Sequence, residues 1–123
     1  CASRSDHSYQ GFVSKWTHID FVNLGFSGSC RGEAEISHYL AKQDCSVFVY
    51  DYDHNTPTLE HLEKTHEPLF LEFRKSHPTT PVIMISAPSF YYDAPFLAKR
   101  RKIVKQTYLN ALSRGDKNVY FID

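Results

Sequence analysis

The chain has 123 residues, of which 41% are hydrophobic and 23% are charged, and this size fits one globular domain with a single core. Fourteen Lys and Arg residues balance fourteen Asp and Glu residues, so the formal net charge is zero. This balance argues against a general basic field for nucleic acid or an anionic membrane surface. No stretch approaches the roughly 18 to 20 apolar residues that a membrane-spanning helix requires.

The first forty residues contain two helical patterns separated by one strand-like run. Ser5 or Asp6 can cap the first helix, because a short polar side chain at the N-cap accepts from an unpaired backbone N–H. The run 19–26 is short and rich in β-branched and aromatic residues, which predicts a strand. Segment 31–43 returns to helical spacing. The predicted inner faces are Tyr9, Phe12, Val13 and Trp16 in the first helix and Ile36, Tyr39 and Leu40 in the second.

The middle of the chain alternates strand, helix and strand. Segments 46–52 and 82–87 are nearly continuous apolar runs, which are typical of strands that are covered on both faces. Segment 58–76 has helical spacing, but Pro68 lies inside it and lacks a backbone N–H. We therefore expect this segment to split into two helices, with Thr65 as the N-cap of the second.

A fourth helix and a fourth strand complete the pattern. Asp93 is placed to cap the helix, Pro95 suits its first turn, and Gly115 marks its C-terminal end. The run 118–122 then predicts a strand. The predicted inner stripe of this helix is Leu97, Val104, Tyr108 and Ala111.

Helices alternate with strands along the whole chain. Strands that are joined through helices pair in parallel by right-handed crossovers, so the order predicts a three-layer α/β/α sandwich with a parallel sheet. Such folds usually begin with a strand, whereas this chain begins with a helical pattern and ends directly after a strand-like run. We therefore expect residues 1–123 to form a single domain that lacks its first strand and is truncated at both ends.

The cysteines give an indication of the redox environment. Cys1, Cys30 and Cys45 are odd in number and do not form a C-x-x-C pair. We expect unpaired thiols in a reducing compartment, which favours a cytoplasmic location over an oxidising one.

Other polar and aromatic clusters have mostly structural interpretations. The basic run 99–102 spreads around a helix, so we predict a solvated surface there instead of a nucleic-acid patch. His61 and His66 fall on helix positions near charged residues and are predicted to be solvated or to cap a helix. The aromatic run 90–92 follows a predicted strand and can either wall a substrate pocket or cover the core.

Ligands in parallel α/β sheets bind outside the carboxyl ends of the strands, and two strand ends carry candidate chemistry here. The first is 23–29. Its run GFSGS at 25–29 approximates the G-x-S-x-G nucleophile elbow, but the second glycine comes one position early. The alternatives are a glycine turn in which Ser27 or Ser29 caps the next helix, and a Gly28 N–H that faces a developing oxyanion.

The second strand end is 51–57. Asp51, Asp53 and His54 can serve as metal ligands, with His61 one or two helical turns farther along. A phospho-acceptor aspartate is an alternative, although it requires an acidic pair at the end of the first strand, which this chain lacks. Asn55 can be a turn residue or, through its side-chain amide, a donor to an oxyanion.

At these two strand ends the sequence resembles the SGNH, or GDSL-type, hydrolases, most closely a bacterial group of GDSL-like lipases and acylhydrolases. The resemblance rests on the runs CASR at 1–4, NLGFSG at 23–28 and YDYDHN at 50–55, supported by PVIM at 81–84 and YFID at 120–123. It covers essentially the whole chain and implies a flavodoxin-like α/β/α fold.

The resemblance also implies two oxyanion-hole donors in this chain. Gly28 matches the family's glycine, and Asn55 matches its asparagine. In the family, the nucleophilic Ser shortly precedes the run that 1–4 resembles. The D-x-x-H segment, with the catalytic Asp and His, follows the run that 120–123 resembles. The nucleophile and the Asp and His are therefore not matched by residues of this chain.

The reaction that the family implies is hydrolysis of a small acyl ester, for example one on a carbohydrate, by a serine nucleophile and without a cofactor. Two alternatives remain. One is a non-catalytic binding domain on the same fold, and the other is a metal or phospho-receiver site at Asp51 and Asp53. The sequence does not determine the oligomeric state.

Overall fold

Three parallel strands form the centre of the molecule. The computed structural model describes residues 7–87 and 94–123. The strands Phe48–Tyr50 (β1), Val82–Ile85 (β2) and Val119–Ile122 (β3) pair in the order β1-β2-β3. Three of the predicted strands are thereby confirmed. The predicted features that lie outside the described residues are the caps at Ser5, Asp6 and Asp93 and the aromatic run 90–92.

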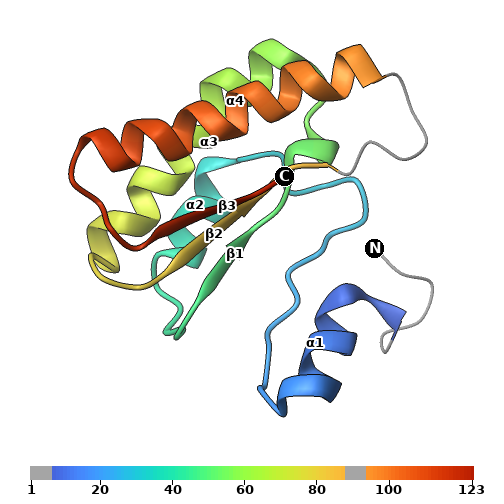
Figure 1. Cartoon of the computed structure of the whole chain (residues 1–123), viewed down its shortest axis with the longest axis vertical. Coiled ribbons are helices and arrows are strands. Elements are labelled where there is room, and N and C mark those ends of the chain that lie inside the picture. Colours follow the sequence, from blue (N-terminus) through green and yellow to red (C-terminus); the bar gives the residue numbers. More distant parts are fainter. Residues whose placement is uncertain (1–6, 88–93) are drawn as a thin grey trace.

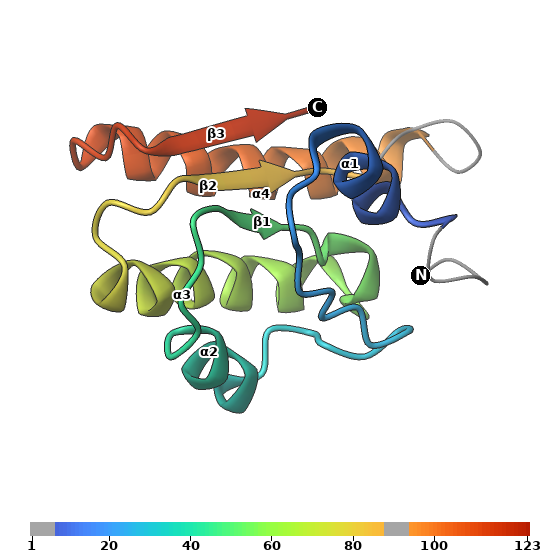
Figure 2. The same cartoon turned by 90° about the horizontal axis from the view of Figure 1, so that it is seen from below.

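Two long helices cover one face of this sheet. Leu59–Ser76 (α3) and Ala94–Ser113 (α4) pack against each other, and α4 also contacts β2 and β3. Figures 1 and 2 show both helices on the same side of the sheet, with Ala34–Leu40 (α2) beside α3. The α/β class with a parallel sheet is confirmed. The core between the layers consists of Tyr50, Tyr52, Leu62, Leu69, Phe70, Phe73, Val82, Met84, Val104, Ala111 and Val119.

Helix α4 follows its predicted pattern. Leu97, Val104 and Ala111 are buried on the stripe that faces the sheet. Gly115 has a φ of 86°, in the left-handed region that glycine adopts without strain, and its N–H donates to the Leu112 carbonyl at 2.9 Å. The helix therefore ends as predicted.

Helix α3 differs from the prediction, because Pro68 does not split it. The helix runs from Leu59 to Ser76 with Pro68 inside. Pro68 is on the exposed face, so the backbone groups that lose an intrahelical hydrogen bond there can be solvated by water. Thr65 is accordingly not an N-cap. Its hydroxyl donates to the His61 carbonyl, four residues earlier, at 2.8 Å. The observed N-cap is Thr58, whose side chain accepts from the His61 N–H.

The strand predicted at 19–26 is wrong. Within residues 7–87 and 94–123 this segment has no ladder partner, and Figure 2 shows it running across the direction of the strands. The Gly25 N–H donates to the Asn23 side chain at 2.9 Å, a local turn that competes with an extended ladder. Val22 is 81% exposed, so this apolar segment is not buried against the sheet.

The first helix spans Tyr9–Thr17 (α1) and begins later than predicted. Its N-cap is Ser8, whose hydroxyl accepts from the Gly11 N–H at 3.2 Å. Figures 1 and 2 show α1 on the side of the sheet opposite α4. Its predicted inner face is largely exposed, and Trp16 is 75% accessible. The spacing of the apolar residues thus predicted the helix correctly, but it did not predict which residues of α1 are buried.

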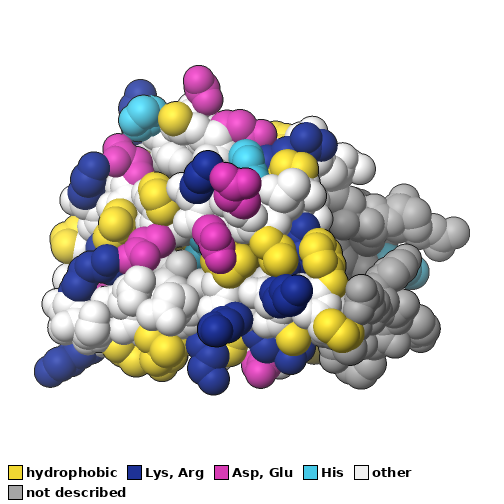
Figure 3. All heavy atoms as spheres, turned by 90° about the horizontal axis from the view of Figure 1, so that it is seen from above, with side chains coloured by type: hydrophobic (Ala, Val, Ile, Leu, Met, Phe, Trp, Pro, Cys, Tyr) yellow, Lys and Arg dark blue, Asp and Glu magenta, His cyan; other side chains and the backbone are white. Residues whose placement is uncertain are grey.

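The distribution of charged side chains on the outer face of the helices is consistent with the formal net charge of zero. Figure 3 shows basic and acidic side chains interleaved over the face that α3 and α4 present. No helix in the described part of the chain is long and apolar enough to cross a membrane.

His66 lies in the core, contrary to the solvated or capping role predicted for it. Its ring centroid is 4.4 Å from that of Tyr50, and its Nδ1 is 2.8 Å from the Thr107 hydroxyl. Burial lowers the pKa of His66 to about 3, because the imidazolium would lose its hydration. The side chain is therefore neutral in the folded protein at physiological pH.

We predict that His66 makes the stability depend on pH. The unfolded chain binds a proton below about pH 6.5 that the folded chain does not take up until about pH 3. The free energy of unfolding should therefore fall with decreasing pH across this window, by up to about 1.4 kcal/mol per pH unit. Urea unfolding of the wild type and of His66→Gln at pH 7, 6 and 5 measures this effect. Parallel stability curves for the two proteins would contradict it.

Candidate active site

The carboxyl end of β1 turns sharply. Residues Asp53–Asn55 form a 3₁₀ turn in which the Asn55 N–H donates to the Tyr52 carbonyl at 2.9 Å. The Thr56 hydroxyl closes the turn by donating to the Asp53 carbonyl at 2.7 Å. Tyr52, Asp53 and Thr56 are buried, so Asn55 is held between anchored neighbours.

A buried arginine fixes this turn from α4. The Arg100 guanidinium donates to the Asp53 carbonyl, to the Thr56 hydroxyl and, at 2.7 Å, to the Thr56 carbonyl. It also lies over the Phe96 ring, 4.6 Å from the centroid.

The solvated surface predicted for 99–102 is therefore wrong for Arg100, which is 4% exposed. The available signal was spacing, because Arg100 follows Leu97 by three residues and precedes Val104 by four, on the buried stripe of α4.

The loop 26–33 approaches this turn. The Ser29 N–H donates to the Phe26 carbonyl at 3.1 Å, and Gly28 adopts a φ of 81° within that turn. The next helix begins at Ala34, so Ser27 and Ser29 do not cap it. A nucleophile elbow requires a strand that runs into the turn and a helix that leaves it, and neither adjoins GFSGS here.

The structure brings the two predicted oxyanion residues together. The Asn55 side-chain amide donates through Nδ2 to the Ser29 carbonyl at 2.7 Å, across 26 positions of sequence. Ser29 is the immediate neighbour of Gly28, so one hydrogen bond links the asparagine to the glycine turn. Phe26, Ser29 and Cys30 also line a hollow of about 460 Å³, together with residues of α2 and the segment before it. Cys30 and Cys45 are unpaired thiols.

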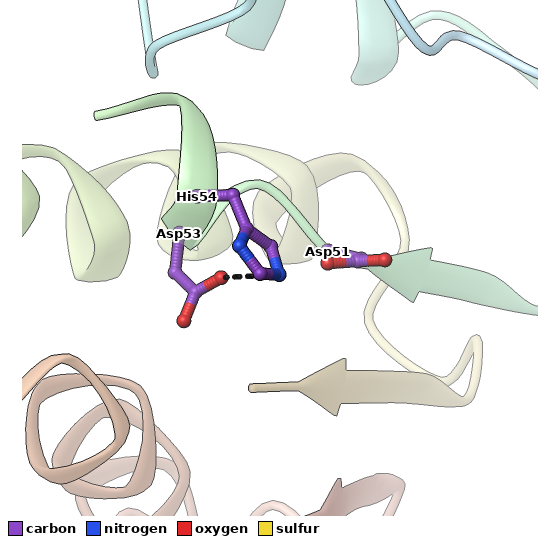
Figure 4. Close-up of side chains that lie close together, drawn as sticks. All are labelled: Asp51, Asp53 and His54. Atoms are coloured by element: carbon purple, nitrogen blue, oxygen red, sulfur yellow. Dashed lines mark ion pairs between the residues drawn. The ribbon is translucent and has the colours of Figure 1, made fainter. Parts of the chain in front are cut away.

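Asp51, just after β1, lies close to Asp53 and His54 of the 3₁₀ turn (Figure 4). Among the residues that the structure describes, they are the one group whose potential ligand atoms lie within 4.8 Å of one another. The His54 Nε2 is 3.8 Å from Asp53 Oδ1. Asp53 Oδ2 accepts from the Ala87 N–H at 3.2 Å, whereas the buried Oδ1 has no hydrogen-bond partner in the described part of the chain.

The electrostatic environment of this group involves α1. Burial and the neighbouring Asp53 carboxylate raise the pKa of Asp51. Burial together with the nearby Asp51 carboxylate raises the pKa of the Tyr9 hydroxyl to about 12. The Asp51 carboxylate thus acts on a side chain of α1.

His61 is not part of this group, contrary to one of the predicted ligand sets. Its Nε2 is 2.7 Å from the Arg31 carbonyl, on the loop that carries Gly28. Sequence reasoning missed this contact because it joins residues 30 positions apart with no recognisable motif between them.

Comparisons with known proteins bear on the family and the fold. A model of the GDSL-like lipase/acylhydrolase family matches residues 1–123. A search of curated proteins found no match. A solved structure designated a GDSL-like lipase, from Bacteroides ovatus ATCC 8483, is 25% identical with a TM-score of 0.84, and the match covers 98% of this chain and 37% of that protein. The salicylyl-acyltransferase SsfX3 from a tetracycline biosynthetic pathway is 14% identical with a TM-score of 0.83. This match covers 99% of this chain and 37% of that protein. The chain thus spans 37% of the length of each of these proteins.

We predict that Gly32→Ala destabilises the protein more than Gly115→Ala. Both glycines have a φ near 87°, which costs an alanine roughly 1–2 kcal/mol. A Cβ at Gly32 would also lie 2.6 Å from the Thr65 Cβ, whereas one at Gly115 would meet nothing within 4 Å. The clash should add roughly 1–3 kcal/mol. Urea unfolding of both variants measures the difference, and equal losses would show that Thr65 moves aside without cost.

Proposed function

The chain belongs to the GDSL-like lipase/acylhydrolase family, and on this basis we propose that it supplies the oxyanion hole of an SGNH-type ester hydrolase. Gly28, through its backbone N–H, and Asn55, through its side-chain amide, are the proposed donors. The observation that carries this assignment is the hydrogen bond from Asn55 Nδ2 to the Ser29 carbonyl, which brings the two donors to one place.

The position of the pair in the fold supports the proposal. Asn55 follows the carboxyl end of β1, which is where parallel α/β sheets bind their ligands. Glycine at position 28 leaves the backbone N–H open to close approach, because it has no side chain and a Cβ built there would meet nothing within 4 Å. Both groups are neutral donors, which suits stabilisation of a negative charge that develops only during the reaction.

The proposed mechanism is acyl transfer through a serine. A histidine removes the serine proton, and the alkoxide attacks the ester carbonyl to form a tetrahedral oxyanion. The Gly28 N–H and the Asn55 amide stabilise this oxyanion together with the N–H of the serine itself. Collapse expels the alcohol, and water then releases the acyl group. We place the serine and the D-x-x-H segment in sequence that flanks this chain.

The proposed substrate is a small acyl ester, such as one on a carbohydrate. The hollow of about 460 Å³ beside Ser29 has room for a small acyl or alcohol group. Its lining combines Phe26 and Ile36 with the carboxylates of Glu33 and Glu35. The acidic rim favours a neutral, hydroxyl-bearing substrate over an anionic one.

We predict that Asn55→Ala lowers the acylation rate of the full-length protein by about a hundredfold or more. Removing the amide deletes one of the donors to the oxyanion. Pre-steady-state hydrolysis of a p-nitrophenyl ester measures the rate. The control is Asn110→Ala, which loses a 2.8 Å hydrogen bond to Glu67 away from the site and should leave the rate unchanged. An unaltered rate in Asn55→Ala would remove Asn55 from the mechanism.

Labelling with a serine-directed fluorophosphonate tests the proposed function itself. Intact mass spectrometry of the full-length protein should show one adduct, which peptide mapping should place outside residues 1–123. The absence of an adduct would favour the non-catalytic binding domain. An adduct on Ser27 would overturn the residue assignment.

A divalent-cation site at Asp51, Asp53 and His54 is a second candidate. It is favoured by the clustered ligand atoms and by the buried Asp53 Oδ1, which has no hydrogen-bond partner among the described residues. If it exists, 1 mM Mn²⁺ or Zn²⁺ should raise the melting temperature by at least about 2 °C through preferential binding to the folded state. Asp51→Asn should abolish this shift, and Asp44→Asn, at the amino end of β1, should not. An unchanged melting temperature in the wild type would leave the His54–Asp53 ion pair as the role of the cluster.

A further inference from the structure

The loop that carries Gly28 has an unfavourable backbone conformation. Four of its residues have positive φ: Ser27 at 43°, Gly28 at 81°, Cys30 at 64° and Gly32 at 87°. Two of these, Ser27 and Cys30, are not glycine, and a left-handed conformation is sterically unfavourable for such residues. The loop therefore depends on contacts with its surroundings to keep this shape.

Those contacts come from the segment that follows β1. Asn55 binds the Ser29 carbonyl, as described above. The Tyr52 and Thr65 hydroxyls, 2.8 Å from each other, lie where any side chain at position 32 would have to fit. His61 provides the third contact through its Nε2, 2.7 Å from the Arg31 carbonyl.

The hydrogen bond from His61 has a defined direction. A carbonyl oxygen only accepts, so the His61 Nε2 must carry the proton and donate it. Both the Nε2–H tautomer and the imidazolium satisfy this requirement. The contact therefore persists whether the ring is neutral or charged.

Arg31 connects His61 to Gly28 by hydrogen bonds. Its carbonyl is held by His61, and its side-chain Nε donates to the Gly28 carbonyl at 3.1 Å. Its backbone N–H donates to the Glu33 carboxylate at 2.6 Å, which fixes the next stretch of the loop. A continuous set of hydrogen bonds thus runs from α3 through Arg31 to Gly28.

His61 is itself held in place. It lies in the first turn of α3, where its backbone N–H donates to the N-cap hydroxyl of Thr58 at 3.1 Å. The next residue, Leu62, is completely buried in the core. The ring therefore projects from a rigid support, which suits a role in holding a strained loop.

We propose that His61 is a positioning residue of the oxyanion hole: through Arg31 it holds the 26–33 loop so that the Gly28 N–H keeps a fixed place beside Asn55. This inference rests on the proposed ester hydrolase function. The imidazole does not touch the substrate, and its effect reaches the reaction only through the position of the Gly28 N–H.

Two substitutions separate the hydrogen bond from the general structural role of the side chain. Gln places its amide nitrogen near the position of a histidine Nε2, whereas Asn places it near Nδ1, too short to reach the Arg31 carbonyl. In the full-length protein, His61→Asn should lower kcat for a p-nitrophenyl ester about tenfold and change KM by less than twofold. His61→Gln should restore kcat to within about threefold of the wild type.

The matched control is His38→Asn, which removes a histidine of α2 whose nearest ionic partner is Glu72 at 3.6 Å. It should leave kcat unchanged. Equal losses in His61→Asn and His61→Gln, or a rise in KM with unchanged kcat, would overturn the positioning role.

Amide hydrogen exchange of residues 26–33 in the same proteins gives a readout that does not require activity. Exchange should accelerate at least about fivefold in His61→Asn and stay near the wild-type rate in His61→Gln. If the wild type does not hydrolyse esters, the proposed function fails, and the exchange data still decide whether His61 holds the loop. Unchanged exchange in His61→Asn would overturn the inference even in an active enzyme.

Discussion

A buried guanidinium determines the geometry at the carboxyl end of β1. Arg100 loses most of its hydration inside the protein, so its N–H groups require acceptors, and the turn after β1 supplies three oxygens. Charge-assisted hydrogen bonds of this kind are stronger than neutral ones. Because Arg100 lies on the buried stripe of α4, the conformation of residues 53–56 follows from the packing of α4 on the sheet. The same packing therefore determines the position of Asn55.

The other half of the candidate site has a different origin. The 26–33 loop contains no helix or strand. Its conformation is unfavourable because Ser27 and Cys30 adopt left-handed φ angles. Its shape is imposed by side chains of residues 52–65, which also include Asn55. Asn55 thus stands on a turn that is anchored in the core, and Gly28 lies on a loop that is held against this turn. This division explains how a loop without secondary structure can keep a defined place beside a rigid turn.

The sequence predicted those features that depend on local periodicity. Four helices, three strands and the end of α4 at Gly115 follow from spacing and glycine placement. The family resemblance implies the oxyanion roles of Gly28 and Asn55, which stay a prediction. The errors have non-local causes. Run 19–26 has the composition of a strand but no partner, and Pro68 is tolerated because it faces solvent. Arg100 and His61 act through contacts with residues 30 to 47 positions away, which no short motif encodes.

Substitutions at the buried turn 53–56 and at the strained loop 26–33 should therefore have different consequences. Loss of a contact to the turn after β1 leaves a buried charge or carbonyl unpaired, and its free-energy cost is expressed in the stability of the whole domain. Loss of a contact to the 26–33 loop releases an exposed segment that already carries local strain. Loss of one of its hydrogen bonds costs little global stability, because few buried groups depend on the loop; an overpacking change at Gly32, against Thr65 of α3, is the exception. The cost appears instead in the position of the Gly28 N–H. If Gly28 and Asn55 act as the proposed oxyanion donors, a substitution that frees the loop lowers the reaction rate without unfolding the domain.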